Sequence, residues 1–537
     1  MNCRNFLRTG FASTGALIGE QAMGATGTSP RSGKPRVDVV EATIFELQAA
    51  MAAGTRTSTG LVNAYLTRIR AIDKSGPRIN SIIELNPDAE SIAIALDRER
   101  KIKGSRGPLH GIPVLLKDNI ATSDRMQTTA GSLALVGASP PRDAFLVTRL
   151  REAGAVILGK TNLSEWANIR STRSTSGWSA RGGLTRNPYA LDRNTSGSSS
   201  GSAAAIAASL ASVAVGTETD GSIVSPSSMN GMVGIKPTVG LVSRSGIVPI
   251  SHSQDTAGPM TRTVADAAAL LTAMAGSDPR DTLTAGAAGS LVDYVKFLDV
   301  DGLKGARIGV VRANFGGRND LATAVVEAAL PVLAAKGAIL VDPVELPVGA
   351  SFETAEIAVL LHEFKVDIAA YLAEYAPGSK IQTLADVIAF NERHRDREMR
   401  YFGQELFLRA QATAGLDAPQ YRDALATCRR IVRAEGIDRA LREHRLDALV
   451  APSNTPAWLT DFIRGDNSGE DFSSPAAVAG YPHITVPAGL VQGLPVGISF
   501  VGGAWSESTL IRLAYAYEQA SRRRQAPTFA RTANPVV

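Results

Sequence analysis

Short apolar runs alternate with helical stretches along most of this chain of 537 residues. The strand-like runs span residues 112–116, 155–158, 213–215, 308–311, 448–450, 484–486 and 498–501. Stretches with helical periodicity, such as residues 145–152, separate most of them. Alternation of this kind is typical of a mostly parallel or mixed β-sheet that carries helices on both faces. The pattern therefore predicts an α/β fold.

The segment from about residue 351 to 445 departs from this alternation. It is a long, charged and helical stretch with one break at Pro377-Gly378, and we expect it to form a helical cap region over the sheet. No repeat of fixed period and no long linker divides the remainder. Residues 37–530 are therefore predicted to form a single domain.

The first 36 residues form a separate region. Arg4-Asn5-Phe6-Leu7-Arg8 and the small residues that follow resemble a bacterial twin-arginine export signal in which Cys3 takes the position of the first arginine. Two outcomes stay open. The protein is exported to the periplasm if this N-terminus works as a signal, and it is cytoplasmic otherwise.

Composition excludes several classes of function. The net charge is +5, but the densest basic run, Arg522–Arg524, has no aromatic residues beside it, so no nucleic-acid partner is predicted. The longest apolar stretch, residues 203–216, is shorter than the ~18–20 residues of a membrane span. Cys3 and Cys428 are the two cysteines, too few for a disulfide framework. The six histidines are isolated, so neither a metal nor another cofactor is predicted.

Ser222 ends the turn Thr219-Asp220-Gly221-Ser222, which follows the apolar run 213–215. A tight turn at this point aims successive backbone N–H groups into one space, the arrangement that a developing oxyanion needs. Taken by itself, the segment is better explained as an Asp-Gly turn between two structural elements.

Ser198 lies in a Ser/Gly-rich segment, residues 194–202, whose composition is that of a flexible linker. A buried helix of small residues is predicted to follow at once, which is unusual for a linker. The segment also contains a Gly-x-Ser-x-Gly pattern centred on Ser199, as in the nucleophile elbow of α/β-hydrolases. That motif requires a preceding strand, whereas residues 187–194 have the composition of a loop.

Lys117 follows the apolar run 112–116. A lysine at a strand end is usually a surface residue. To act as a base it must lose its proton near pH 7, which requires a pKa well below the ordinary value of ~10.4. Only a buried site lowers the pKa that far. Lys117, Ser198 and Ser222 would then supply a base, a proton relay and a nucleophile.

These three segments together resemble the signature of the amidase signature hydrolases, whose mechanism uses a Ser–cis-Ser–Lys triad. The two serines are 24 residues apart, as in that family. Flanking segments agree with the resemblance, which runs from about residue 40 to 525: residues 150–162, 234–240, 255–259 and 480–487. It implies the amidase signature fold, with a large central mixed sheet.

Carried over residue by residue, the resemblance makes Ser222 the nucleophile that forms an acyl-enzyme. Ser198 bridges Ser222 to the base Lys117, and Ser199 supports the relay. The oxyanion hole is formed by four backbone N–H groups, those of Thr219, Asp220, Gly221 and Ser222. The expected activity is hydrolysis of linear amides without a metal or other cofactor.

Two departures from the usual family motifs point to a branch. The nucleophile segment is Asp220-Gly221-Ser222 rather than Gly-Gly-Ser, and Ser198 lies among serines rather than glycines. Both variants resemble the bacterial peptide amidases, which release ammonia from C-terminal peptide amides. Residues 223–226 carry no arginine that could hold a substrate carboxylate, so a neutral, amide-terminated small molecule or short peptide is the expected substrate.

Several alternatives stay open from the sequence alone. Within the family they are an aryl or aliphatic acylamidase with the same triad and a subunit of a tRNA-dependent amidotransferase. From a different class, an α/β-hydrolase esterase would use Ser199 with His444 or His483 as its partner. A catalytically inactive scaffold is disfavoured by the intact triad. The oligomeric state cannot be read from the sequence.

Overall fold

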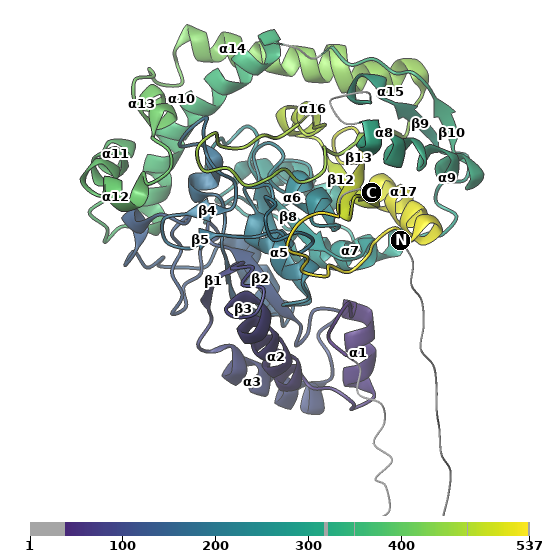
Figure 1. Ribbon diagram of the computed structural model, residues 1–537, viewed down its shortest axis with the longest axis horizontal. Helices are drawn as coiled ribbons and strands as arrows, with labels where there is room; N and C mark the ends of the chain where they lie inside the picture. The colour runs from purple at the N-terminus through teal and green to yellow at the C-terminus, as the bar shows by residue number, and fades with distance from the viewer. Residues whose placement is uncertain (1–37, 316–319, 348–349, 470, 535–537) are drawn as a thin grey trace, which may run out of the picture. The chain divides into compact units, whose positions relative to one another are not determined.

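Strands of the central sheet account for the apolar runs of the sequence. The computed structural model describes residues 38–315, 320–347, 350–469 and 471–534 (Figure 1). In chain order the sheet contains β1 (Ile82–Leu85), β2 (Pro113–Lys117), β3 (Val156–Thr161), β6 (Val213–Glu218), β7 (Val233–Lys236), β8 (Thr256–Thr261), β9 (Arg307–Val310), β10 (Ile339–Val341), β11 (Ala448–Pro452), β12 (His483–Val491) and β13 (Leu494–Val501). The predicted export signal in residues 1–36 lies outside the described residues.

The sheet has 11 strands in the order β1-β3-β2-β6-β8-β7-β12-β13-β11-β9-β10. It is mixed: β2 pairs parallel with β3 and β6, whereas β8 pairs antiparallel with both β6 and β7. Every residue of β2, β3, β6 and β8 is buried. Strands covered in this way carry near-continuous apolar runs, which is why the sequence predicted most of them. The α/β prediction is confirmed.

Helices surround this sheet. They are α1 (Ile44–Ala52), α2 (Ser58–Arg68), α3 (Ala89–Lys103), α4 (Phe145–Glu152), α5 (Ser200–Ala207), α6 (Val224–Met229), α7 (Val264–Met274), α8 (Asp320–Glu327), α9 (Leu330–Ala335), α16 (Ser474–Ala479) and α17 (Glu507–Ser521). α5 lies on β6, β8, β2 and β3, while α6 packs on β7, β12 and β13. A small hairpin, β4 (Trp178–Ser179) with β5 (Gly183–Leu184), stands apart from the sheet.

The residues of α5 explain how closely it approaches the sheet. All eight of them are buried, and all but Ile206 are Ser, Gly or Ala. At Gly201 a Cβ atom would collide with the carbonyl oxygens of Ser81 and Asn162. The Ser/Gly-rich segment of residues 194–202 therefore leads directly into a buried helix and is not a linker.

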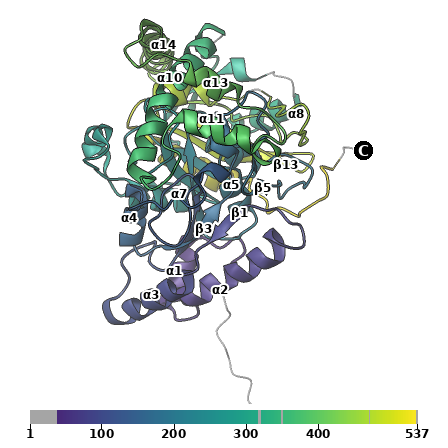
Figure 2. The same ribbon diagram turned by 90° about the vertical axis from the view of Figure 1, so that its left-hand side faces the viewer.

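The predicted helical region is a run of helices that starts with the long helix α10: α10 (Ala350–Tyr375), α11 (Leu384–Arg393), α12 (Arg395–Glu398), α13 (Glu405–Gln411), α14 (Pro419–Arg429) and α15 (Asp438–His444). α10 packs against α14 and α13. Figures 1 and 2 show α10 and α14 on the side of the sheet opposite to α1, α2 and α3. Within the described ranges, no helix is long and apolar enough to cross a membrane.

Candidate active site

Lys117 and Thr217 lie at the carboxyl ends of β2 and β6, which are neighbouring parallel strands. Because such ends share one edge of a sheet, the two side chains meet there. Lys117 Nζ donates to Thr217 Oγ1 at 2.8 Å and to the Thr217 carbonyl oxygen at 3.1 Å. It also donates to Ser198 Oγ at 2.7 Å. Lys117 and Ser198 have no exposed surface, so the structure brings two of the three predicted catalytic residues into direct contact inside the protein.

The environment of Lys117 changes its acidity. Burial lowers the pKa of the Lys117 ammonium from 10.5 to about 7, and the negative charges of Glu218 and Asp255 act in the opposite direction. The effect of burial is the larger one, because an ammonium group taken out of water loses its hydration. Much of the population at neutral pH therefore carries the neutral amine, the form that can accept a proton.

The side chain of Ser199 connects the loop that contains Ser198 to strand β6 by hydrogen bonds. The Ser199 hydroxyl donates to the Thr217 carbonyl oxygen at 3.0 Å and accepts from the Thr217 N–H at 3.2 Å. The peptide bond between Gly197 and Ser198 is cis. No histidine contacts the Ser199 hydroxyl within the described part of the chain. The esterase alternative centred on Ser199 therefore lacks the partner that it requires.

The turn that carries Ser222 is fixed by a buried carboxylate. Glu218 Oε2 accepts from the N–H groups of Ile223 at 2.7 Å and of Val224 at 3.0 Å, on the far side of the turn. Gly221 has a φ of 74°, in the left-handed region that favours glycine. A Cβ atom there would also lie 3.0 Å from Ser473 Oγ. The glycine of the Asp-Gly-Ser sequence is thus required by the backbone conformation of the turn.

Four successive backbone N–H groups of this turn are free. Those of Thr219, Asp220, Gly221 and Ser222 donate no hydrogen bond to any described residue, although Thr219, Gly221 and Ser222 are buried and Asp220 is half-buried. Nearly all buried N–H groups in proteins are paired. Successive unpaired N–H groups in a turn form a concave site for a negative charge.

Ser222 contacts the segment of Ser198 and Ser199 through the main chain, because Ser199 N donates to the Ser222 carbonyl oxygen at 3.2 Å. No hydrogen bond links the hydroxyls of Ser198 and Ser222 among the described residues. Catalytic hydrogen bonds are often formed only when substrate is bound. The role of Ser222 as nucleophile therefore stays a prediction, which its position beside the free N–H groups favours.

Sequence reasoning missed the side chains that hold the turn from outside. Thr219 Oγ1 donates to Asp255 Oδ1 at 2.5 Å. The hydroxyls of Ser473 and Ser474 donate to the two oxygens of Asp220 at 2.5 and 2.6 Å. Asp255 lies in residues 255–259, one of the segments that carry the family resemblance. The resemblance singles out this segment, but it does not predict the hydrogen bond from Thr219. Nothing in the sequence links Asp220 to serines some 250 residues further on.

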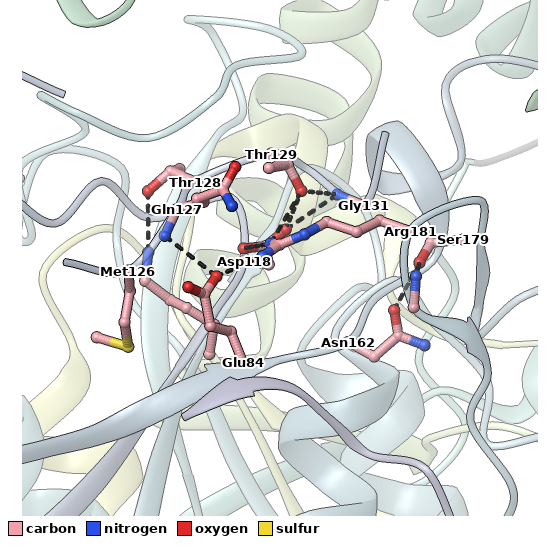
Figure 3. A network of polar contacts seen from close by, with 12 residues as sticks. Glu84, Asp118, Met126, Gln127, Thr128, Thr129, Gly131, Asn162, Ser179 and Arg181 are labelled. Atoms are coloured by element: carbon pink, nitrogen blue, oxygen red, sulfur yellow. Dashed lines mark hydrogen bonds and ion pairs between the residues drawn. The ribbon is translucent and has the colours of Figure 1, made fainter. Parts of the chain in front are cut away.

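A second polar network surrounds Asp118, the residue after the buried lysine (Figure 3). Asp118 Oδ2 accepts from Thr129 Oγ1 at 2.5 Å and from Gly131 N at 3.2 Å. Asp118 Oδ1 accepts from Arg181 Nη1 at 3.2 Å. Arg181 also forms an ion pair with Glu84 of β1. Burial raises the pKa of Asp118, while the charge of Arg181 opposes this effect. The network fixes the chain on the carboxyl side of β2.

One group of potential metal ligands lies together in the described part of the chain. Ligand atoms of His252, Glu363 and Asp367 are within 4.8 Å of one another. They already have partners: His252 Nδ1 lies 2.9 Å from Asp367 Oδ2, His252 Nε2 lies 3.3 Å from Glu363 Oε1, and three hydroxyl groups donate to Glu363. The hydrogen bond to Asp367 raises the pKa of His252. The ion pairs and hydrogen bonds to Glu363 and Asp367 of α10 therefore explain why these three side chains lie together, without a metal ion.

Comparison with known proteins decides the family. The sequence profile of the amidase family matches residues 60–511. The chain belongs to the amidase family. Its fold is likewise that of solved amidases: a native peptide amidase from Stenotrophomonas maltophilia is 55% identical, with a TM-score of 0.87, over 91% of this chain and 99% of that one. The resemblance inferred from the sequence is thereby confirmed.

Other amidases extend this comparison. A probable amidase of Arabidopsis thaliana is 45% identical over 91% of this chain and 92% of its own length. An amidase family protein from Bacillus anthracis is 38% identical, with a TM-score of 0.83, over 91% of this chain and 93% of the other. A peptide amidase bound to the competitive inhibitor chymostatin is 54% identical, with a TM-score of 0.87, over 91% of this chain and 99% of that one. This amidase is therefore a hydrolase of linear amide bonds.

Proposed function

We propose that this amidase releases ammonia from the C-terminal amide of short peptides through an acyl-enzyme on Ser222. The observation that carries the proposal is the buried hydrogen bond of 2.7 Å between Lys117 Nζ and Ser198 Oγ, beside the turn that ends in Ser222. A neutral lysine there can take a proton that a serine hydroxyl relays.

The proposed reaction begins when Ser222 Oγ attacks the amide carbonyl carbon. The Ser222 proton passes to Ser198 as the Ser198 proton passes to Lys117. The carbonyl oxygen becomes an oxyanion that the free N–H groups of residues 219–222 stabilise. The C–N bond then breaks, and the nitrogen leaves as ammonia with the proton that Lys117 returns through Ser198. Water, activated along the same path, hydrolyses the ester and releases the free acid and Ser222.

The choice of a peptide amide rests on two points. The solved peptide amidases share 54–55% of their residues with this chain, and one of them binds the inhibitor chymostatin. Residues 223–226, which follow Ser222, contain no arginine to pair with a substrate carboxylate. A neutral, amide-terminated peptide fits such a site better than a free acid does.

Ammonia release from an N-acetylated dipeptide amide tests the proposal, with wild-type enzyme beside Ser222→Ala. We expect release by the wild type and none by the variant. Release by the variant would reject Ser222 as the nucleophile. A folded wild type that leaves the peptide amide intact but hydrolyses anilides or short aliphatic amides would instead identify an acylamidase with the same triad.

A further inference from the structure

Gln254 lies against the outer side of the proposed oxyanion hole. Its side-chain nitrogen, Nε2, donates to the carbonyl oxygen of Thr219 at 3.3 Å and to Glu356 Oε1 of α10 at 3.0 Å. Gln254 is 1% exposed, Thr219 is 8% exposed and Glu356 is 9% exposed. An amide nitrogen has two hydrogens to donate, and each of them has one acceptor here.

The bond to Thr219 has a consequence for its neighbour. A trans peptide unit is planar, so the C=O of one residue and the N–H of the next point in opposite directions. The carbonyl oxygen of Thr219 and the N–H of Asp220 belong to one such unit. Holding the Thr219 oxygen toward Gln254 therefore turns the Asp220 N–H away from Gln254. That N–H group has no partner among the described residues.

Asp255, the residue after Gln254, holds the side chain of Thr219. Asp255 Oδ1 accepts from Thr219 Oγ1 at 2.5 Å, while Asp255 Oδ2 accepts from the N–H groups of Ile250 and Ser251 at 2.8 and 3.0 Å. Thr219 is thus fixed at two points by two adjacent residues. The bond to Asp255 fixes the side chain, and the bond to Gln254 fixes the plane of the peptide unit.

We infer that Gln254 is a positioning residue for catalysis: it orients the Asp220 N–H toward the substrate oxyanion and is itself oriented by Glu356 of the cap helix α10. The inference rests on the proposed function, because it assigns a purpose to the oxyanion hole of residues 219–222. It also makes the docking of α10 a condition for full activity, since α10 supplies the acceptor that aligns Gln254.

Gln254→Leu tests this role, because leucine is similar in size and donates no hydrogen bond. Kinetics with the peptide amide should show kcat reduced by about 10- to 100-fold, somewhat less than the ~10²–10³-fold typical of deleting an oxyanion donor. KM should change by less than about two-fold, because the contact acts on the transition state. The matching peptide aldehyde forms a tetrahedral adduct with the nucleophile, and its inhibition constant should rise by about the same factor as kcat falls.

Gln404→Leu is the matched control. Gln404 is 3% exposed, and its Nε2 likewise donates to a backbone carbonyl oxygen, that of Ile388 at 3.2 Å, and to a glutamate, Glu392, at 3.0 Å. None of these residues contacts the turn of residues 218–222. The control should therefore keep wild-type kcat and aldehyde inhibition. Gln254→Met, with an unbranched side chain that adapts to its surroundings, repeats the test with a different packing change.

The outcomes separate the inference from the proposed function. Parallel loss of kcat and of aldehyde affinity in the Leu and Met variants supports it. Wild-type kcat, a loss confined to KM, or unchanged aldehyde affinity would overturn it. Failure of both variants to fold while Gln404→Leu folds would assign Gln254 a role in folding and would also overturn it. Activity retained in Ser222→Ala would instead reject the proposed function.

Discussion

Lys117 Nζ donates a hydrogen bond of 2.7 Å to Ser198 Oγ, and neither side chain is exposed to solvent. The direction of proton flow between them depends on the charge of the lysine. A protonated Lys117 is a donor with no lone pair, whereas the neutral amine can accept the Ser198 proton. The same burial that separates the pair from water lowers the pKa of Lys117 to about 7, so one physical cause gives both a contact shielded from water and the neutral amine that the proposed base requires.

The first prediction is that kcat/KM for the peptide amide rises with pH along a limb centred near pH 7. Below that pH Lys117 is protonated and cannot accept a proton, and above it the amine is free. Lys117→Ala should lower kcat by about 10²- to 10⁴-fold at pH 8, where the wild-type amine is free, and by less at acid pH, where the wild-type lysine is protonated as well. A pH-rate series on both proteins checks this. An acidic limb that stays near pH 7 in residual Lys117→Ala activity would assign the limb to another group.

Glu218→Gln should move that limb to lower pH. The negative charge of Glu218 raises the pKa of Lys117, and burial raises the pKa of Glu218 itself to about 7. Removing the charge destabilises the protonated lysine, so the limb shifts toward acid. Glutamine keeps an oxygen that accepts from Ile223 N and Val224 N. The pH profile of kcat/KM gives the shift.

Asp266→Asn is the control for this prediction. Asp266 is also fully buried, with a pKa raised to about 6 by burial, and it accepts from the N–H of Ile44, the first residue of α1. It does not affect the pKa of Lys117. The limb should stay at its wild-type position in this variant. A limb that shifts equally in both variants would mean that the change is not specific to the charge beside Lys117.

The sequence predicted those parts of the fold that have continuous apolar runs. Strands β2, β3, β6, β9, β11, β12 and β13 all lie within or overlap the expected segments. Of the strands in the large sheet it missed β1, β7, β8 and β10, and it also missed the small hairpin of β4 and β5. β8 is Thr-Ala-Gly-Pro-Met-Thr, with few apolar side chains and a proline, so neither β propensity nor alternation marks it. Its pairing with β6 and β7 comes from the surrounding sheet.

For the candidate site, the sequence indicated which residues to consider but not the contacts among them. Lys117, Ser198 and Ser222 could be named because the family resemblance fixes their positions, whereas the contacts around them could not. Gln254 and Ser473 reach the turn from loops far away in the chain, and sequence patterns carry no information about such pairings. A lowered pKa at Lys117 required that the side chain be buried. The sequence was compatible with burial, and in the structure the side chain is fully buried.

Arg181→Met should destabilise the protein by about 3 kcal/mol. Arg181 pairs with the fully buried carboxylate of Asp118, and removing one partner of a buried pair costs about 3–5 kcal/mol. The charge of Lys160 still compensates part of the Asp118 charge. The lower end applies because Arg181 is 13% exposed. Asp118→Asn in the same protein should restore part of the loss. Urea unfolding at pH 7 measures the free energies.

The exposed pair of Arg395 and Glu392 is the control for that measurement. Their side chains are 68% and 46% exposed, so Arg395→Met should change the free energy of unfolding by less than about 0.5 kcal/mol. Equal losses in Arg181→Met and Arg395→Met would contradict the view that burial of Asp118 sets the cost.

Chelators should leave the activity unchanged. The proposed reaction uses an amine and two hydroxyl groups, and the cluster of His252, Glu363 and Asp367 is already paired internally. Ammonia release measured before and after prolonged incubation with EDTA checks this. A loss of activity that added Zn²⁺ or Mg²⁺ restores would contradict the proposed mechanism.

The last prediction concerns His483, which is buried and pairs with Ser499 Oγ through Nε2 at 2.6 Å. Burial, aided by the charge of Lys236, lowers its pKa to about 3. In the unfolded chain the ordinary value is about 6.5. Between these two pH values the unfolded state binds a proton that the folded state does not, so the free energy of unfolding falls as the pH falls. The slope from one such group is about 1.4 kcal/mol per pH unit.

His483→Gln should flatten this acid dependence between pH 6 and pH 4, because glutamine does not bind the proton, while turnover at pH 8 is retained. Urea unfolding across that range gives the slope, and the ammonia assay gives the turnover. Replacing the exposed His394 by glutamine is the matched control and should keep the wild-type slope. Loss of turnover in folded His483→Gln would favour a histidine-dependent esterase, because the mechanism through Lys117 and Ser198 uses no imidazole.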